Sequence, residues 1–99
     1  MDHFNGLTPA EAERLALLAE ECGEVVQVIG KILRHGYDSR HPDNMDGPDN
    51  RALLEQEVGD LSAAVSIAME RGDIQYSKVT KAHRSKLRRI EKYFHHQDD

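Results

Sequence analysis

Apolar residues recur at helical spacing along most of this chain, and this periodicity restricts the fold more than any other feature. In the first stretch the recurring residues are Leu15, Leu18, Cys22, Val26, Ile29 and Leu33. Steps of three and four residues are those of one face of an α-helix. Upstream, Thr8-Pro9-Ala10-Glu11 combines a capping hydroxyl, a proline suited to the first helical position and the acid of a capping box. The pattern therefore predicts a helix from Pro9 to His35, ended by Gly36 in a left-handed conformation.

A loop and a second helix follow. Residues 37–49 show no apolar period and are rich in Asp, Asn, Gly and Pro, so they predict a loop. Helical spacing resumes at Asp49 or Asn50 and continues to about Arg71. We therefore expect a second long helix over this stretch.

A third helix is expected in the last part of the chain. Gly72 is a stop signal for the second helix, and Asp73 is expected to cap a helix that extends to about Phe94. The tail, residues 95–99, is expected to fray. No segment has the alternating pattern of a strand. The prediction is an all-α fold with three main helices.

Size and composition narrow the class of protein. With 99 residues, the chain is long enough for a single domain, residues 1–99. A hydrophobic content of 38% and the absence of Trp predict a thin core for a lone subunit, so we expect an oligomer. The net charge of −5 disfavours nucleic acid as a partner. A single Cys and the lack of a long apolar run predict a cytoplasmic protein without a membrane partner.

Four acidic residues interrupt the apolar pattern of the first two predicted helices. They are Glu21, Glu24, Glu57 and Asp60, two pairs in which the members are three residues apart. Residues at this spacing face the same way on a helix. A helical wheel places Glu21 and Glu57 inside the apolar stripes, and Glu24 and Asp60 at their edges. A carboxylate in such a stripe is costly unless a cation meets it.

Two kinds of cation are candidates to neutralise the four acids. One is an inter-helix network of salt bridges with the third helix, where Lys86 falls on the apolar side and Arg89 lies beside it. The other is a divalent metal ion, since hard oxygen ligands suit Mg²⁺ or Mn²⁺, and Mg²⁺ commonly bridges carboxylates and phosphate oxygens. A di-iron carboxylate bundle matches less well, because neither pair has the Glu-x-x-His pattern. The metal is the better account of two acid pairs on two helices.

These motifs resemble those of a known enzyme family. Glu20-Glu21-Cys22-Gly23-Glu24 followed by Glu57-Val58-Gly59-Asp60 looks like the EExxE…ExxD signature of the MazG-like all-α nucleoside triphosphate pyrophosphohydrolases. The basic segment from Lys81 to Arg89 is similar to the one that follows these motifs in the family. The resemblance implies a four-helix-bundle-like core completed by oligomerisation, as a homodimer or homotetramer.

The resemblance also implies an activity and roles for particular residues. The activity is Mg²⁺-dependent hydrolysis of a nucleoside triphosphate to the monophosphate and pyrophosphate, in a nucleotide-pool or house-cleaning role; Mn²⁺ is a possible replacement. The four acids would be the metal ligands, and Glu20 an auxiliary acid that orients a ligand or the attacking water. Lys86 and Arg89 would hold phosphates, with Lys81 as a weaker candidate.

Three alternatives remain open at the level of sequence. The interval between Glu24 and Glu57 is longer than is usual in the family, because of the loop 37–49. That loop would be a lid or a base-recognition element. His35, Tyr37, Arg40 and His41, in or next to the loop, are candidates to contact a nucleobase or a phosphate. Dimeric dUTP/dCTP pyrophosphatases and phosphoribosyl-ATP pyrophosphohydrolase share the acid pattern and are alternatives for the substrate. A non-enzymatic helical module, whose acids pair with the basic helix, is the alternative from a different class.

Overall fold

The computed structural model describes residues 5–98, which form three α-helices and a short 3₁₀ helix. In chain order these are α1 (Pro9–His35), α2 (Asn50–Glu70), α3 (Tyr76–Arg89) and η1 (Ile90–Tyr93). The part of the chain from residue 5 to residue 98 contains no strand, only an isolated antiparallel bridge between Arg40 and Asp49. The predicted all-α fold class is therefore confirmed.

Local sequence signals account for the ends of the first two helices. The Thr8 hydroxyl accepts a hydrogen bond from the backbone N–H of Glu11, and the Glu11 carboxylate accepts one from the N–H of Thr8, as in a capping box. Gly36 ends α1 with a φ of 87°, which favours glycine. The Asp49 carboxylate caps α2 by accepting from the N–H of Ala52.

The predicted start of the third helix was wrong. Asp73 does not cap α3, whose N-cap residue is Gln75. The Asp73 carboxylate instead accepts hydrogen bonds from the guanidinium of Arg14, at 2.6 and 2.9 Å. The partner lies 59 positions away in the sequence, so the helix signal at Asp73 was overridden by a tertiary ion pair. The regular α-helix also ends at Arg89, with the last predicted turn formed by η1.

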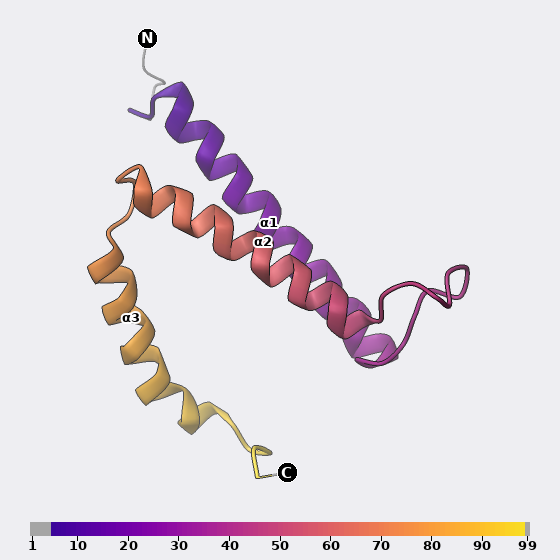
Figure 1. Cartoon of the computed structure of the whole chain (residues 1–99). Coiled ribbons are helices and arrows are strands. Elements are labelled where there is room, and N and C mark those ends of the chain that lie inside the picture. Colours follow the sequence, from indigo (N-terminus) through magenta and orange to yellow (C-terminus); the bar gives the residue numbers. More distant parts are fainter. Residues whose placement is uncertain (1–4, 99) are drawn as a thin grey trace.

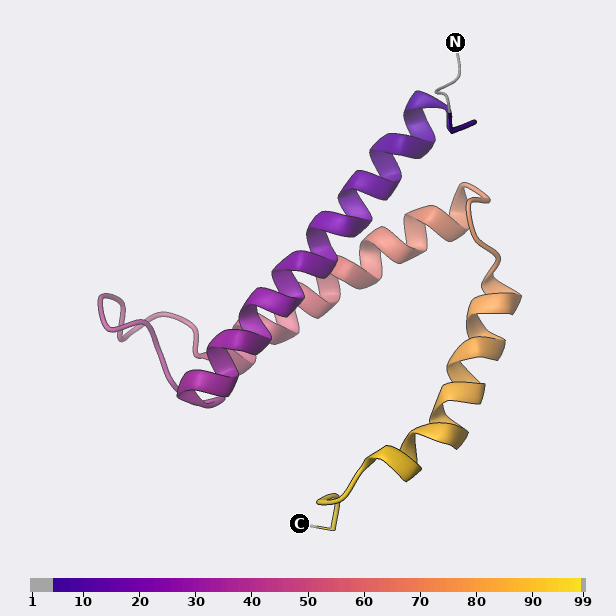
Figure 2. The same ribbon diagram turned by 180° about the vertical axis from the view of Figure 1, so that it is seen from behind.

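Helices α1 and α2 pack side by side and antiparallel, whereas α3 extends away from this pair (Figures 1 and 2). The apolar residues that are buried within residues 5–98 are Val28, Ala64 and Ala68. The radius of gyration is 17.3 Å, against roughly 13 Å for a compact domain of this length. The chain thus forms a helical hairpin with a separate basic arm. No helix between residues 5 and 98 is both long enough and apolar enough to cross a membrane.

The apolar stripe predicted along α1 is largely exposed in the single chain. Exposed fractions are 47% for Leu15, 67% for Val26, 42% for Ile29 and 82% for Leu33. Cys22, expected in the core, is also exposed. The face of α1 that packs on α2 is a different one, which contains Val28 and both site acids. Helix α1 therefore has two apolar faces, and α2 covers one of them.

Candidate metal centre

The antiparallel packing of α1 and α2 brings all four predicted acids together. Glu21 and Glu24 project from α1, and Glu57 and Asp60 from α2. Each offers a carboxylate oxygen, and these oxygens all lie within 4.8 Å of one another. Three of the residues are half-buried, while Asp60 is exposed. We call Glu21, Glu24, Glu57 and Asp60 the carboxylate cluster.

Two oxygens of the carboxylate cluster are buried without a hydrogen-bond partner. They are Oε2 of Glu21 and Oε2 of Glu57, which come from facing helices. A buried acceptor without a donor is costly, and more so when it carries charge. Both atoms belong to the residues that the helical wheel placed among apolar side chains, Glu21 and Glu57.

The crowding of like charges changes the proton affinity of the cluster. Partial burial is the main reason why the pKa of Glu21 lies above its usual value of 4.5, with added repulsion from Glu24, Asp60 and Glu20. The pKa of Glu57 is also raised, chiefly because its protonated form can share a hydrogen bond with Glu24, and then because of burial and the neighbouring charges. In the absence of a metal ion, Glu21 and Glu57 therefore bind protons more readily than an ordinary glutamate does.

No basic side chain of the described chain neutralises the cluster. The ion pairs among residues 5–98 join Arg14 to Asp73, Arg51 to Asp38 and, if protonated, His41 to Asp43. The salt-bridge network considered from sequence is therefore not formed within a single chain. Hard, closely spaced carboxylate oxygens, two of them buried and unpartnered, fit a divalent cation such as Mg²⁺ or Mn²⁺.

The other predicted site residues lie outside the cluster. Glu20 is exposed on α1, although its charge contributes to the raised pKa of Glu21. Lys81, Lys86 and Arg89 are exposed on α3, which does not pack against the helical pair. The Lys86 ammonium lies 6.0 Å from the centre of the Tyr93 ring, and the Arg89 guanidinium donates to the Ser85 hydroxyl. A single chain does not bring these cations to the acids.

Lys31 was not among the residues predicted from sequence to form the site. It lies seven residues after Glu24 on α1, so it occupies nearly the same face, about 10 Å further along the helix. That spacing is the sequence signal that would have identified it. Its surroundings are described below.

The fold and the carboxylate cluster together define a class of protein, the all-α proteins that hold a candidate metal site between two packed helices. A comparison with protein-family models gives a match to the MazG nucleotide pyrophosphohydrolase domain over residues 10–95. The chain belongs to this family. No curated protein and no solved structure shows a significant match to the chain.

Proposed function

We propose that this protein is a Mg²⁺-dependent nucleoside triphosphate pyrophosphohydrolase, which converts a (d)NTP and water into the (d)NMP and pyrophosphate. The observation that carries the proposal is the carboxylate cluster, with its oxygens within 4.8 Å of one another, in a chain of the MazG family. Mn²⁺ has the same ligand preference and is the expected substitute. A role in maintaining the nucleotide pool follows from this chemistry.

In this proposal the carboxylate cluster holds the divalent cation, and its buried oxygens gain the partner they otherwise lack. When bound, the cation neutralises phosphate charge and activates water. Glu20, exposed one position before Glu21, orients a ligand or the attacking water. Helices α1 and α2 fix the carboxylates before substrate arrives, so little reorganisation is needed during the reaction.

We further propose that the working form is a homodimer or homotetramer, in which α3 of one subunit lies against the helical pair of another. The exposed apolar stripe of α1 supports this proposal, as do the extended shape and the exposed Leu87 and Tyr93 beyond the hairpin. Such an arrangement brings Lys86 and Arg89, and less directly Lys81, to the phosphates of a substrate bound at the acids. It also places cations beside the carboxylate cluster, whose acids form no ion pair within the described part of one chain.

The test is a screen of canonical and modified (d)NTPs with Mg²⁺, with Mn²⁺ and with EDTA, in which pyrophosphate and phosphate are detected separately. We expect release of pyrophosphate and nucleoside monophosphate, abolished by EDTA. The preferred substrate decides between a general activity and one like that of dUTP/dCTP pyrophosphatases or phosphoribosyl-ATP pyrophosphohydrolase. Release of phosphate alone, or activity in EDTA, contradicts the proposal. Absence of both turnover and Mg²⁺ or Mn²⁺ binding supports a non-enzymatic helical module instead.

A further inference from the structure

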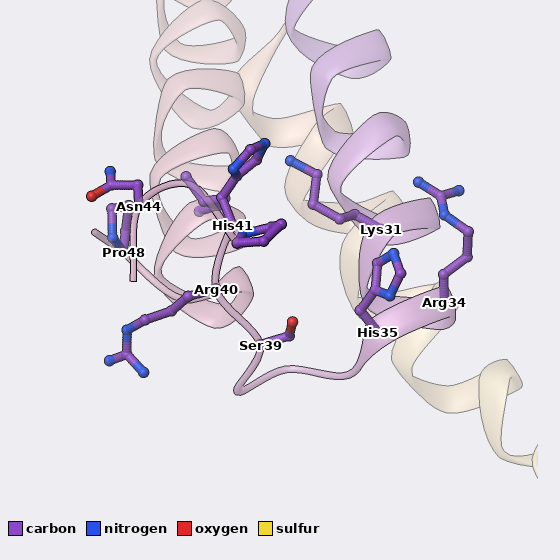
Figure 3. Close-up of a pocket in the computed structure, with 10 residues that line it drawn as sticks. Lys31, Arg34, His35, Ser39, Arg40, His41, Asn44 and Pro48 are labelled. Atoms are coloured by element: carbon purple, nitrogen blue, oxygen red, sulfur yellow. The ribbon is translucent and has the colours of Figure 1, made fainter. Parts of the chain in front are cut away.

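A second concave site lies at the loop end of the hairpin. It is a pocket of about 680 Å³ between the last turns of α1, the loop 37–49 and the first turns of α2. Figure 3 shows Lys31 extending from α1 toward the side of the pocket formed by His41 and the loop. The volume is in the range of small-molecule sites. We call this site the basic pocket.

The residues that line the basic pocket include three cations and no acid, together with two histidines and the apolar Pro42, Pro48 and Leu53. Lys31 and Arg34 come from α1 and Arg40 from the loop, and none of the three forms an ion pair within residues 5–98. Ser39 and Asn44 add polar groups to the lining. A cationic pocket in a chain of net charge −5 is a local reversal of the overall charge. It therefore attracts an anion.

The loop that forms the pocket is held in place at both ends. Asn50, 4% exposed, donates from its backbone N–H to the carbonyl of Ser39 and from its side chain to the carbonyl of Gly36, each at 3.0 Å. Within the loop, Nε of Arg40 donates to the carbonyl of Gly47 at 3.0 Å. These bonds order the lining in the absence of a ligand, which lowers the entropic cost of binding.

The basic pocket adjoins the carboxylate cluster along both helices. Lys31 lies seven residues after Glu24 on α1, and Leu53, which also lines the pocket, lies four residues before Glu57 on α2. Helical side chains lean toward the N-terminus of their helix, so Lys31 leans toward the turn that bears Glu24. An elongated anion at the acids can thus extend toward the basic pocket.

Neutralisation of the C-terminal end of α1 explains only part of this cluster of cations. Basic residues in the last helical turn interact favourably with the helix dipole, and Arg34 is one of them. Lys31 precedes that turn, and Arg40 lies in the loop. The helix dipole therefore does not account for Lys31, and Arg40 is placed by its hydrogen bond to the carbonyl of Gly47. In Figure 3 the guanidinium groups of Arg34 and Arg40 lie on opposite sides of the pocket.

We propose that the basic pocket binds a polyphosphate chain through Lys31, Arg34 and Arg40. The chain is either a free polyphosphate anion or the terminal phosphates of a nucleoside triphosphate whose other end lies at the carboxylate cluster. The second form rests on the function proposed above; the first does not. Charge-assisted hydrogen bonds from Lys and Arg are the contacts that recognise phosphate oxygens most strongly.

The experiment is calorimetric titration of the full chain with tripolyphosphate, in EDTA and at low salt. We expect binding to the wild type and at least a tenfold weaker affinity in the double variant Lys31→Gln/Arg40→Gln, because about two charge-assisted hydrogen bonds are lost. The matched control is Arg84→Gln/Arg88→Gln, which removes two charges from a separate basic hollow on α3 and should retain the affinity. Circular dichroism checks that each variant is helical. If the double variant fails to fold, the titration is done with the single variant Lys31→Gln instead.

Equal affinity in the wild type and the pocket variant, or loss of binding in the α3 control, overturns the proposal. Steady-state kinetics then separates the two sources of the polyphosphate. A raised KM in the pocket variant, with tripolyphosphate as a competitive inhibitor, assigns the pocket to the substrate. An unchanged KM with non-competitive behaviour assigns it to a separate anion. If no nucleotide is hydrolysed, the proposed function is wrong. The metal-free titration still shows whether the basic pocket binds polyphosphate.

Discussion

At the scale of single residues, the most consequential atoms are the buried oxygens of Glu21 and Glu57. They face each other from two helices without a hydrogen-bond donor, and the pKa of each residue is raised. Folding of the metal-free chain therefore works against desolvation and repulsion at this point. Acidic groups that have raised pKa values and meet at one point between two helices are typical of a functional site.

Replacement of one carboxylate should separate stability from activity. We expect Glu57→Gln to lower kcat/KM by about 100-fold or more, because a ligand of the cation is lost. The same change should raise the Tm of the metal-free protein, because it removes a poorly solvated charge. Thermal unfolding in EDTA and a pyrophosphate-release assay measure the two effects.

The matched control for Glu57→Gln is Glu55→Gln, which removes the same charge from an exposed position of α2. It should leave both the Tm and the activity near the wild-type values. Added Mn²⁺ should raise the Tm of the wild type and of this control, and that of Glu57→Gln much less. An equal rise in all three proteins would contradict the assignment of the metal to the carboxylate cluster.

The raised pKa values of Glu21 and Glu57 also predict the direction of the pH dependence. An acid whose pKa is higher in the folded state stabilises that state below its unfolded value, here about 4.5, and loses this contribution as the pH rises through the folded value. The metal-free protein should therefore become more stable as the pH is lowered from neutral toward about 4.5, the unfolded value. Urea unfolding at several pH values measures this slope, which should be smaller in Glu57→Gln. A slope unaffected by that substitution would refute the explanation.

At the scale of helices, the sequence predicted the structural features that depend on residues close to one another in the chain. The starts of α1 and α2 follow from the side chains of Thr8, Glu11 and Asp49, whose partners lie three residues away. The convergence of the four acids followed from their i,i+3 spacing on two amphipathic helices. Sequence could not predict that Asp73 binds Arg14, because that partner is set by how the turn after α2 meets α1.

Sequence analysis named His35, Arg40 and His41 as candidate contacts but missed that Lys31 and Arg34 join them in one pocket, and it missed the uncovered face of α1, for a related reason. Lys31 is linked to Arg40 through the fold of the loop, which depends on the distant contact of Asn50 with Gly36. The apolar stripe that contains Val26 and Leu33 has the period of a core, and periodicity does not distinguish a core within one chain from an interface between two.

The Arg14–Asp73 ion pair should stabilise the end of the hairpin. Its side chains are 21% and 17% exposed, and two hydrogen bonds connect them. We expect Asp73→Asn to lower the Tm, with Glu70→Gln, at the exposed end of α2, as the control. The hydrogen bond to Arg14 lowers the pKa of Asp73 below 3.8, so this contribution is present above that pH and is lost as the pH falls through the folded value. An unchanged Tm in Asp73→Asn at neutral pH would show that the turn does not need the pair.

At the scale of the whole molecule, the described chain is elongated, as the proposed oligomer requires of its subunits. The principal extents are 49 × 38 × 21 Å, and 14 large hydrophobic side chains among the described residues are exposed. The buried apolar residues of the described chain, Val28, Ala64 and Ala68, provide little hydrophobic stabilisation. Further burial between subunits is the physical way to supply the rest.

Introduction of charge on the exposed stripe of α1 should therefore break the assembly. We expect sedimentation of the wild type as a multiple of 11.2 kDa, and of Val26→Glu/Leu33→Glu as a species of 11.2 kDa with reduced helicity. Met45→Glu, at a loop position that is 65% exposed, is the control and should keep the wild-type mass. A monomeric wild type with full activity would contradict the proposed oligomer.

The separation of α3 from its own hairpin has a genetic consequence. On the proposed assembly, each active centre combines the acids of one polypeptide with the cations of another. Two inactive alleles, one with Glu57→Gln and the other with Lys86→Gln/Arg89→Gln, should then complement each other when co-expressed, because mixed assemblies contain a centre with both halves intact. Conversely, a chain with a defective α3 should act as a dominant inhibitor of the wild type with which it assembles.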